Sequence, residues 1–531
     1  MTHAIGRKRR RFDVEILETR MLLSGSAATS KIQAAEPATA APLTITAQIA
    51  PKFDPDGNGV VLQSRVTIVG HTAPGAQVRL ETGAGGARHK MTKANAHGVY
   101  HFTVSLTVGR DSFQISCTDT AGDSAATQLK VTRADAVIDW NTMALDAIRN
   151  AKTNPPMAAR NLAVVQLAIY TAVNSIEARF QPYAGIKIQA PPGASSWAAA
   201  AAAADEALTS LYPTQAVSFD AALAETLATA PGRAARVRGE DFGRRAADAI
   251  LALRAHDGSG KFVDAPPATQ PGMWSPTPPS YSPPVGLNFA FVTPFAMTSP
   301  SQFRPGPPPA LDSAAYAAAY NEVKSVGGTN STIRTADQTA FARFWSDLPG
   351  VTFTPPGHWN QIAQVGAMSR RLTLPAEAHL LALLDIALAD AGISCWETKN
   401  YYDFWRPVTA IRADNSDGNP LTTADPAWTP LWATPPFSSY TSGHATFSAA
   451  AAAVLDSVFG ASFSFTDTGD PTEHLAPRHF TGFDQAAAEA AASRMYGGIH
   501  FRFDNETGLA VGAKVGDYVL LHELLPLKRP K

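Results

Sequence analysis

Three clusters of basic and polar residues in the last third of the chain constrain its fold more than any other feature. They supply one ammonium, two guanidiniums, a hydroxyl, a glycine amide and two imidazoles, from Lys399, Arg406, Ser442, Gly443, His444, Arg494 and His500. Arginine pairs with oxygens in the plane of its fork, and lysine adds a compact point charge. A tetrahedral, phosphate-like oxyanion needs this mixture, so we expect the fold to bring the three clusters together.

The local sequence predicts how the first two clusters are held. Lys399 and Arg406 are seven residues apart, which would place them on one face of a helix, and Pro407 marks a helix start or break. The Ser-Gly-His triplet at 442–444 directly precedes an alanine-rich stretch, 445–459, that reads as a helix. Its amides would point outward at the positive helix end, which is a ready anion site.

The third cluster begins with Arg494, near the end of another alanine-rich helix. Gly497 and Gly498 let the chain bend before His500, and Asp504 follows about one helical turn later. A carboxylate in that place accepts a hydrogen bond from one imidazole nitrogen and leaves the other nitrogen free to attack or ligate.

Composition bounds the rest of the molecule. A chain of 531 residues is too long for one core, so two or three domains are expected. The net charge of -1 gives no electrostatic case for nucleic acid or an anionic membrane, and we expect no membrane-spanning segment. Cys117 and Cys395 fall in different predicted domains, which favours two isolated buried thiols.

Residues 1–42 are predicted to be a basic, export-type segment followed by a flexible spacer. Residues 7–11 are all basic, but charges interrupt the apolar run that a secretory signal would need. Residues 17–24 resemble the Leu-Glu-Pro-Arg-x-Leu-Leu-Ser segment of exported proteins from planctomycete-type bacteria, with Thr19 in place of the proline. This resemblance implies export to the periplasm, the cell surface or the extracellular space.

Residues 43–133 alternate apolar and polar positions between Gly, Asp and Asn turns, which predicts a small β-sandwich. Its turns resemble those of bacterial immunoglobulin-like repeats. Residues 54–59 resemble the start of a calcium loop, but Arg65 occupies the position of the twelfth, acidic ligand, so a turn is favoured. The predicted strands are 44–49, 65–69, 77–81, 99–104 and 112–116.

Residues 134–531 carry apolar residues at helical spacing, which predicts an α-helical bundle. Residues 264–309 are rich in proline and have no sustained period, so we expect them to drape over the helices. The predicted helices are 139–150, 160–177, 198–211, 237–255, one from 314 onward, 380–392, 445–459, 484–496 and 508–524.

The joint pattern of the three clusters resembles the signature of the superfamily of type 2 phosphatidic acid phosphatases and vanadium haloperoxidases. The resemblance covers most of residues 139–525 and is strongest to the soluble haloperoxidases, whose fold is an all-α bundle. It implies that the non-axial oxygens of vanadate are bound by Lys399, Arg406, Ser442, the Gly443 amide and Arg494. It also implies that His500 bonds axially to vanadium, with Asp504 orienting it, and that His444 acts as the acid–base.

Neighbouring residues extend this resemblance. Trp396 and Phe437 match aromatic positions that line the halide pocket of fungal-type chloroperoxidases, although both also suit helix packing. Asp347 resembles an acidic residue that supports an arginine of the site. Thr441 departs from the family, which most often has proline before Ser-Gly-His.

The resemblance implies a haloperoxidase that oxidises halide with hydrogen peroxide to hypohalous acid, which then halogenates a small organic substrate. His444 would take a proton from peroxide, and Lys399 would polarise it. An alternative is a secreted acid phosphatase, in which phosphate replaces vanadate, His500 is the nucleophile and His444 protonates the leaving group. A third reading is a surface interaction protein with an inert helical domain, but the complete ligand set disfavours it.

Overall fold

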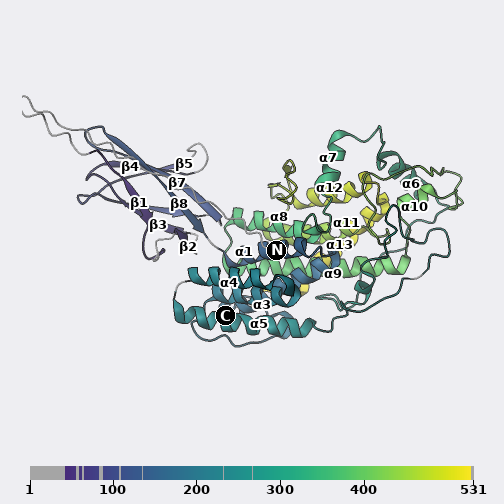
Figure 1. The fold of residues 1–531 in the computed structure, drawn as a ribbon, viewed down its shortest axis with the longest axis horizontal. Helices are drawn as coiled ribbons and strands as arrows, with labels where there is room; N and C mark the ends of the chain where they lie inside the picture. The colour runs from purple at the N-terminus through teal and green to yellow at the C-terminus, as the bar shows by residue number, and fades with distance from the viewer. Residues whose placement is uncertain are drawn as a thin grey trace, which may run out of the picture.

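A computed structural model describes residues 42–527 of the protein, apart from 55–58, 62–64, 83–87, 107–108, 134, 231 and 266. The strands and the main helical body form two separate lobes (Figure 1). Strand β8 ends at Arg133 and helix α1 begins at Ala136, so the change from strands to helices falls between these two residues. The export motif at residues 17–24 lies outside the described residues.

The smaller lobe contains two sheets around one apolar core. The first sheet has the order β1-β3-β6 and the second has the order β2-β8-β7-β4-β5, with β2 and β8 parallel and the other neighbours antiparallel. The strands are β1 (Thr46–Ile49), β2 (Val60–Val61), β3 (Arg65–His71), β4 (Gln77–Thr82), β5 (Arg88–Lys93), β6 (Val99–Ser105), β7 (Gly109–Thr118) and β8 (Ser124–Arg133).

All five predicted strands are present, because their inward positions alternate as a half-buried strand requires. In β3, for example, Val66 and Ile68 are buried, whereas Arg65 is exposed. The predicted set does not include β2, β5 or β8. Strand β5 consists mostly of basic or polar residues and lies at the edge of its sheet. Charged edge strands resist pairing with other chains.

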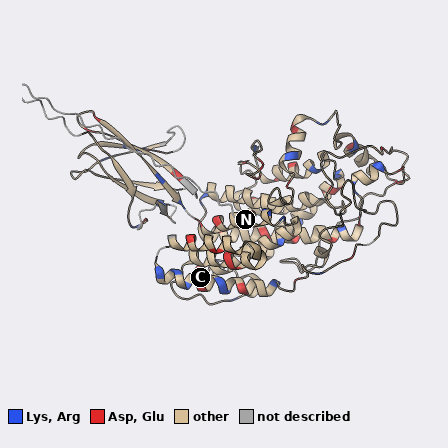
Figure 2. Ribbon diagram, in the orientation of Figure 1, with Lys and Arg blue, Asp and Glu red and all other residues tan. Residues whose placement is uncertain are grey.

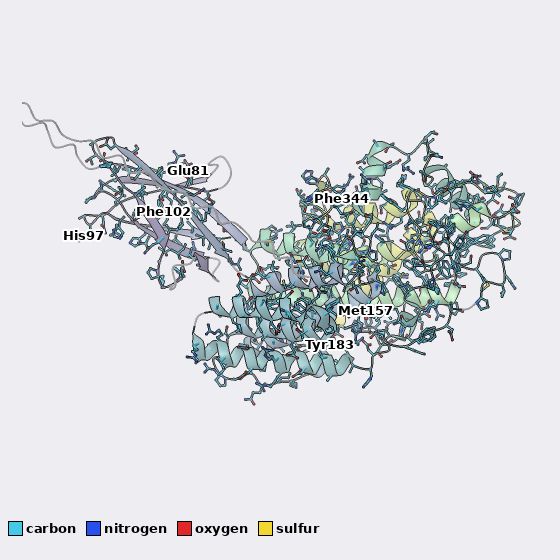
Figure 3. All side chains as sticks on the ribbon, in the orientation of Figure 1. Glu81, His97, Phe102, Met157, Tyr183 and Phe344 are labelled. Carbon is cyan, nitrogen blue, oxygen red and sulfur yellow. The ribbon has the colours of Figure 1, made fainter. Side chains whose placement is uncertain are left out.

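The larger lobe is built from helices around a second apolar core, which shares no residue with the first among the described residues. The helices are α1 (Ala136–Asn150), α2 (Pro155–Glu177), α3 (Ser196–Leu211), α4 (Ala216–Thr229), α5 (Arg233–Arg254), α6 (Ala314–Val326), α7 (Ala336–Phe344), α8 (Thr354–Arg370), α9 (Leu374–Tyr402), α10 (Pro407–Arg412), α11 (Gly443–Phe459), α12 (Phe483–Tyr496) and α13 (Arg502–His522). A short hairpin of β9 (Phe465–Asp467) and β10 (Arg478–Phe480) connects α11 to α12. Figure 3 shows Met157 and Tyr183 among these helices and Phe102 among the strands.

Helices α4, α7 and α8 were not predicted. Helix α8 begins with Thr-Pro-Pro-Gly, which looks like a loop in the sequence. Proline is tolerated in the first turn of a helix because the amide there has no partner within the helix. Tertiary packing stabilises the helix here, since nearly all of the first half of α8 is buried.

Helices α11 and α13 approach each other closely, and this contact holds two of the three clusters together. Gly508, Gly512 and Gly516 form a stripe along α13 at four-residue spacing. A Cβ atom at Gly512 would lie 2.2 Å from the carbonyl oxygen of Thr446 on α11. Because these glycines have no side chains, the starts of α11 and α13 can lie close together.

The proline-rich segment drapes over the helical body, as expected. Its backbone amides at Phe295, Ala296 and Met297 donate to the buried carboxylate of Asp390 on α9, at 2.6 to 2.8 Å. Further toward the C-terminal end of α9, the Val285 carbonyl accepts a hydrogen bond from the Trp396 indole at 3.2 Å. The segment thus covers the end of α9 that carries the first cluster.

Helix α9 bears on the expectation that no segment spans a membrane. By length and composition it is apolar enough to cross a membrane, with a mean hydropathy of 1.6 over its best window. However, 94% of that window is buried inside the protein, so its apolar surface packs against the other helices. Acidic and basic residues are scattered over both lobes (Figure 2), in keeping with a net charge near zero.

The separate cores predict that the two lobes fold independently. Residues 43–133 and 134–531, expressed as separate fragments, are expected to give β-type and α-type circular dichroism spectra respectively. The physical reason is that each fragment keeps its own buried apolar cluster. A helical spectrum from the first fragment, or an unfolded second fragment, would contradict this prediction.

Candidate active site

The first cluster comes from two helices and the turn between them. Lys399 lies in the last turn of α9, Asp403 then adopts a left-handed conformation with φ of 43°, and Arg406 caps the start of α10. The expectation that Lys399 and Arg406 share one helix was therefore wrong. The turn at Asp403 redirects the chain, and Pro407 starts a new helix, where its missing amide does no harm.

The second cluster is the N-terminus of α11, as predicted. The Ser442 hydroxyl caps this helix and accepts from the Ala445 amide at 3.5 Å. Gly443 is the first helical residue, so its amide belongs to the unpaired group at the positive helix end. His444 follows at the second position.

The third cluster spans the turn between α12 and α13. Arg494 lies in the last turn of α12, and Gly498 has φ of 75°, which brings its backbone against Gly327 and sends the chain toward His500. Asp504 lies in the first turn of α13. The predicted bend and the predicted spacing are both present.

The three cations of the site are buried and held by backbone carbonyl groups. The Lys399 ammonium donates to the Ser438 and Ser439 carbonyls at 2.7 and 2.9 Å. Arg406 donates to the Phe437 and Ile499 carbonyls, each at 2.7 Å. Arg494 Nη1 donates to the Trp345 carbonyl at 2.6 Å.

Burial of like charges weakens the hold of these cations on their protons. Burial, together with the nearby Arg406, lowers the pKa of Lys399 to about 7. Burial lowers the pKa of Arg406 to about 9, where Arg494 acts in the same direction and Asp504 opposes it. Burial also lowers the pKa of Arg494 to about 10. An anion among these groups would relieve the repulsion.

His500 is oriented by Asp504. Its Nδ1 donates to Asp504 Oδ2 at 3.0 Å, and the same oxygen accepts from the Ser439 hydroxyl at 2.5 Å and the Phe501 amide at 3.0 Å. These neighbours assign the proton to Nδ1. His500 Nε2 therefore carries its lone pair toward Arg406 Nη1, 3.0 Å away. Burial, then the charges of Arg406 and Lys399, lower the pKa of His500 well below its usual range.

His444, at the start of α11, lies near Asp347. Its Nε2 is 3.7 Å from Asp347 Oδ2. Burial lowers the pKa of His444 well below its usual range, and the charges of Arg494 and His358 act in the same direction. A neutral imidazole in this position can accept a proton from a neighbouring molecule.

The structure leaves buried nitrogen atoms that an oxyanion would satisfy. Within the described part of the chain, Arg406 Nη2, Arg494 Nε and His444 Nε2 have no hydrogen-bond partner. An unpaired buried guanidinium nitrogen is unfavourable, so the two arginine nitrogens indicate a ligand, and His444 Nε2 is left able to accept a proton. Three cations and one helix N-terminus lie close to two carboxylates, Asp504 and Asp347. The residues present therefore fit a multiply charged tetrahedral oxyanion.

Two aromatic rings lie beside the ammonium. The ring centroids of Trp396 and Phe437 are 5.1 Å apart. Lys399 Nζ is 5.2 Å from the Phe437 centroid and 5.8 Å from the Trp396 centroid, and the Arg406 guanidinium is 4.9 Å from Phe437. These rings exclude water on one side of the cations and strengthen the electrostatic interactions there.

The sequence analysis found Asp347 but missed its partners. His358 on α8 lies between Asp347 and Asp467, and both distances are 3.0 Å. Neither His358 nor Asp467 belongs to a recognisable motif, and they are 109 residues apart. The only signal was the unexplained histidine in a stretch that looked like a loop.

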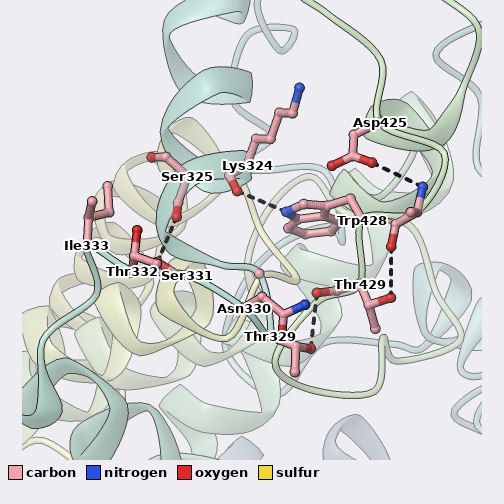
Figure 4. A pocket seen from close by; sticks show the side chains of 12 residues that line it. Lys324, Ser325, Thr329, Asn330, Ser331, Thr332, Ile333, Asp425, Trp428 and Thr429 are labelled. Carbon is pink, nitrogen blue, oxygen red and sulfur yellow. Dashed lines mark hydrogen bonds between the residues drawn. The ribbon is translucent and has the colours of Figure 1, made fainter.

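A separate hollow of about 450 Å³ lies elsewhere on the helical lobe (Figure 4). None of the three clusters contributes to it. Its lining includes Lys324, Asn330, Asp425 and Trp428, and the Trp428 indole donates to the Lys324 carbonyl at 2.9 Å. Trp428 therefore forms part of the wall of the hollow, and its indole N–H already has a hydrogen-bond partner.

Comparisons with known proteins identify the fold. Residues 379–525 match a family model described as the VCPO second helical-bundle domain. The chain is 28% identical over 486 residues to vanadium chloroperoxidase of Curvularia inaequalis, across 69% of this chain and 78% of that protein. A bacterial vanadium-dependent chloroperoxidase of known structure, in its holo form, is 17% identical with a TM-score of 0.54, covering 69% of this chain and 91% of that one. This last match concerns the fold alone.

A nearer structural relative is a bacterial vanadium-dependent iodoperoxidase. It is 31% identical with a TM-score of 0.66, and the match covers 75% of this chain and 97% of that one. The matched part of this chain is large enough to include the helical lobe and its three clusters. The chain belongs to the vanadium-dependent haloperoxidase family.

Proposed function

We propose that the protein is a vanadate-dependent haloperoxidase, which converts hydrogen peroxide, halide and a proton into hypohalous acid and water. The observation that carries the proposal is the buried cation cluster with unpaired nitrogen atoms at its centre. Vanadate is a tetrahedral oxyanion of the charge that this cluster requires. The hypohalous acid would then halogenate a small organic substrate.

Each residue of the cluster has a proposed part in holding vanadate. Lys399, Arg406 and Arg494 would neutralise its charge, while the Ser442 hydroxyl and the Gly443 amide would donate to its oxygens. His500 Nε2, whose lone pair now accepts from Arg406 Nη1, would bond to vanadium. Bound vanadate supplies the Lewis-acid centre at which peroxide becomes reactive toward halide.

The remaining steps belong to the protein's own side chains. His444 Nε2 would accept a proton from the incoming peroxide, since this imidazole is neutral in the cation-rich site. The Lys399 ammonium would polarise the oxygen that the halide attacks. Trp396 and Phe437 would line the halide pocket, because their rings lie against Lys399 and keep water from that side.

We also propose that the protein is exported and that its smaller lobe is an immunoglobulin-like spacer or adhesion module. Residues 17–24 support export through their resemblance to an export segment. Two sheets around a single apolar core support the immunoglobulin-like assignment. The helical lobe alone, residues 134–531, should therefore retain full enzyme activity.

The proposed chemistry is tested with purified protein, with and without added orthovanadate. Chloride, bromide and iodide are each supplied with hydrogen peroxide, and a phosphate ester is supplied separately. Halide oxidation that depends on vanadate is expected. If the protein hydrolyses the ester and oxidises none of the halides, it is an acid phosphatase with a phosphohistidine at His500.

A substitution at His444 separates proton transfer from vanadate binding. His444→Ala is expected to lose halide oxidation by about 100-fold or more, the usual contribution of a general acid–base. Vanadate binding should persist, because Lys399, Arg406, Arg494 and His500 remain. Isothermal titration calorimetry measures the second property. Unchanged bromide oxidation across about pH 5–8, where histidine titrates, would show that His444 is not the proton acceptor.

A further inference from the structure

A buried histidine behind the active site has two carboxylates as its hydrogen-bond partners. His358 is fully buried; its Nδ1 is 3.0 Å from Asp347 Oδ1, and its Nε2 is 3.0 Å from Asp467 Oδ2. An ionised carboxylate accepts hydrogen bonds but cannot donate them. Both ring nitrogens must therefore carry protons, and His358 is an imidazolium cation. The two carboxylates raise the pKa of His358 well above its usual range, against the effect of burial.

Aromatic rings surround the same imidazole. Trp345 stacks on it at 4.6 Å with an interplanar angle of 30°, and the centroids of Phe344 and Phe353 lie at 5.6 and 6.0 Å. The faces of aromatic rings attract cations, most strongly away from water. Two carboxylates and three rings thus form an enclosure suited to a permanent cation.

This enclosure is joined to the active site through residues 345–347. The Trp345 carbonyl accepts from Arg494, and the Trp345 indole donates to Glu489 at 3.0 Å. Asp347 has a left-handed backbone with φ of 48°, and its second oxygen, Oδ2, faces His444 at 3.7 Å. A change in the position or charge of His358 would therefore affect Arg494 and His444 through residues 345–347.

We propose that His358 is a positioning residue of the active site, a permanent cation that clamps Asp347 and so presents its second oxygen to His444. The clamp has two consequences. It fixes the segment whose carbonyl holds Arg494, and its positive charge cancels one of the two carboxylates behind the anion site. Without it, excess negative charge would lie close to the oxyanion. The proposal rests on the proposed function of the site, because it assigns His358 a part in that function.

The titratable groups that face His358 define the design of the test. They are Asp347, Asp467, His444 and, through a longer-range interaction, Glu473. His358→Gln removes the positive charge and keeps hydrogen-bonding capacity. The double variant His358→Gln/Asp467→Asn also removes one carboxylate and so restores the net charge. His379→Gln is the matched control, since His379 is a mostly buried histidine stacked on Phe180 in another part of the helical lobe.

Affinity for orthovanadate and for inorganic phosphate, measured by calorimetry, is the first readout. His358→Gln is expected to weaken both by about 10–100-fold, as losses behind a ligand shell usually do. The double variant should recover much of that loss, whereas His379→Gln should match the wild type. A purely structural role for His358 predicts no recovery in the double variant, and that result would overturn the proposal.

The wild-type protein supplies a second readout that does not need the variants to fold. Nitrogen-15 NMR of the histidine rings should show one imidazolium that keeps both protons from pH 5 to above pH 8, and that signal should vanish in His358→Gln. A neutral His358 near pH 7 would overturn the proposal. Failure of the proposed function is recognised differently, as a wild type that binds vanadate or phosphate but oxidises no halide.

Discussion

Replacing His500 with alanine is expected to abolish measurable vanadate binding, the largest effect of any single substitution in this protein. His500 Nε2 carries a lone pair inside the cation cluster, because Nδ1 donates to Asp504. The cations that remain would attract the oxyanion, but no imidazole nitrogen would be left to bond to it. Calorimetric titration with orthovanadate measures the loss, and circular dichroism checks the fold.

Substitution of Asp504 should have a smaller effect of the same kind. Asp504→Asn removes the carboxylate that accepts from His500 Nδ1, Ser439 and the Phe501 amide, so His500 loses its fixed orientation. Vanadate affinity should fall about 10–100-fold, which is typical for the partner of a metal ligand. His479→Ala, at an exposed histidine of β10, is the control and should bind normally. Tight vanadate binding by the His500→Ala protein would refute the assignment of His500 as a vanadate ligand.

Oxyanion affinity is expected to fall about tenfold per pH unit above pH 7, through the titration of Lys399. Burial lowers its pKa from 10.5 to about 7, with a contribution from Arg406. Above pH 7 the ammonium of the anion-free protein loses its proton. An anion binds the charged form, so binding then takes up one proton, and one linked proton changes the affinity tenfold per pH unit. Sulfate is a suitable probe because its own charge is constant over this range.

The variant Lys399→Met should abolish this dependence and weaken sulfate binding below pH 7. The same shift has a consequence for stability with a defined sign. Between pH 7 and 10.5 the unfolded chain binds more protons than the folded, anion-free protein, so the contribution of Lys399 to the free energy of unfolding rises with pH across that window. Sulfate at saturation should remove the rise, because the bound anion restores the charged form. Equal pH slopes for the wild type and Lys399→Met would contradict this account.

The features of the site that could be read from the sequence are those set by a few neighbouring residues. A serine that caps an alanine-rich helix, a pair of glycines that bends the chain before His500, and an acidic residue four positions beyond it each depend on local geometry alone. The chemistry of the site could also be predicted from the sequence, because the types of residue and their order along the chain indicate a site for an oxyanion.

What only the tertiary structure decided is how distant segments meet. The turn at Asp403 places Lys399 and Arg406 on separate helices, where the sequence spacing suggested a single one. His358 acquires its charge from Asp347 and Asp467, whose distances in the chain are 11 and 109 residues. The close contact of α11 and α13, at Gly508 and Gly512, brings the backbone of α13 against Ser442 and Thr446. Such contacts depend on packing between surfaces that no local pattern encodes, and the burial that results lowers the pKa of groups such as Lys399 and His500.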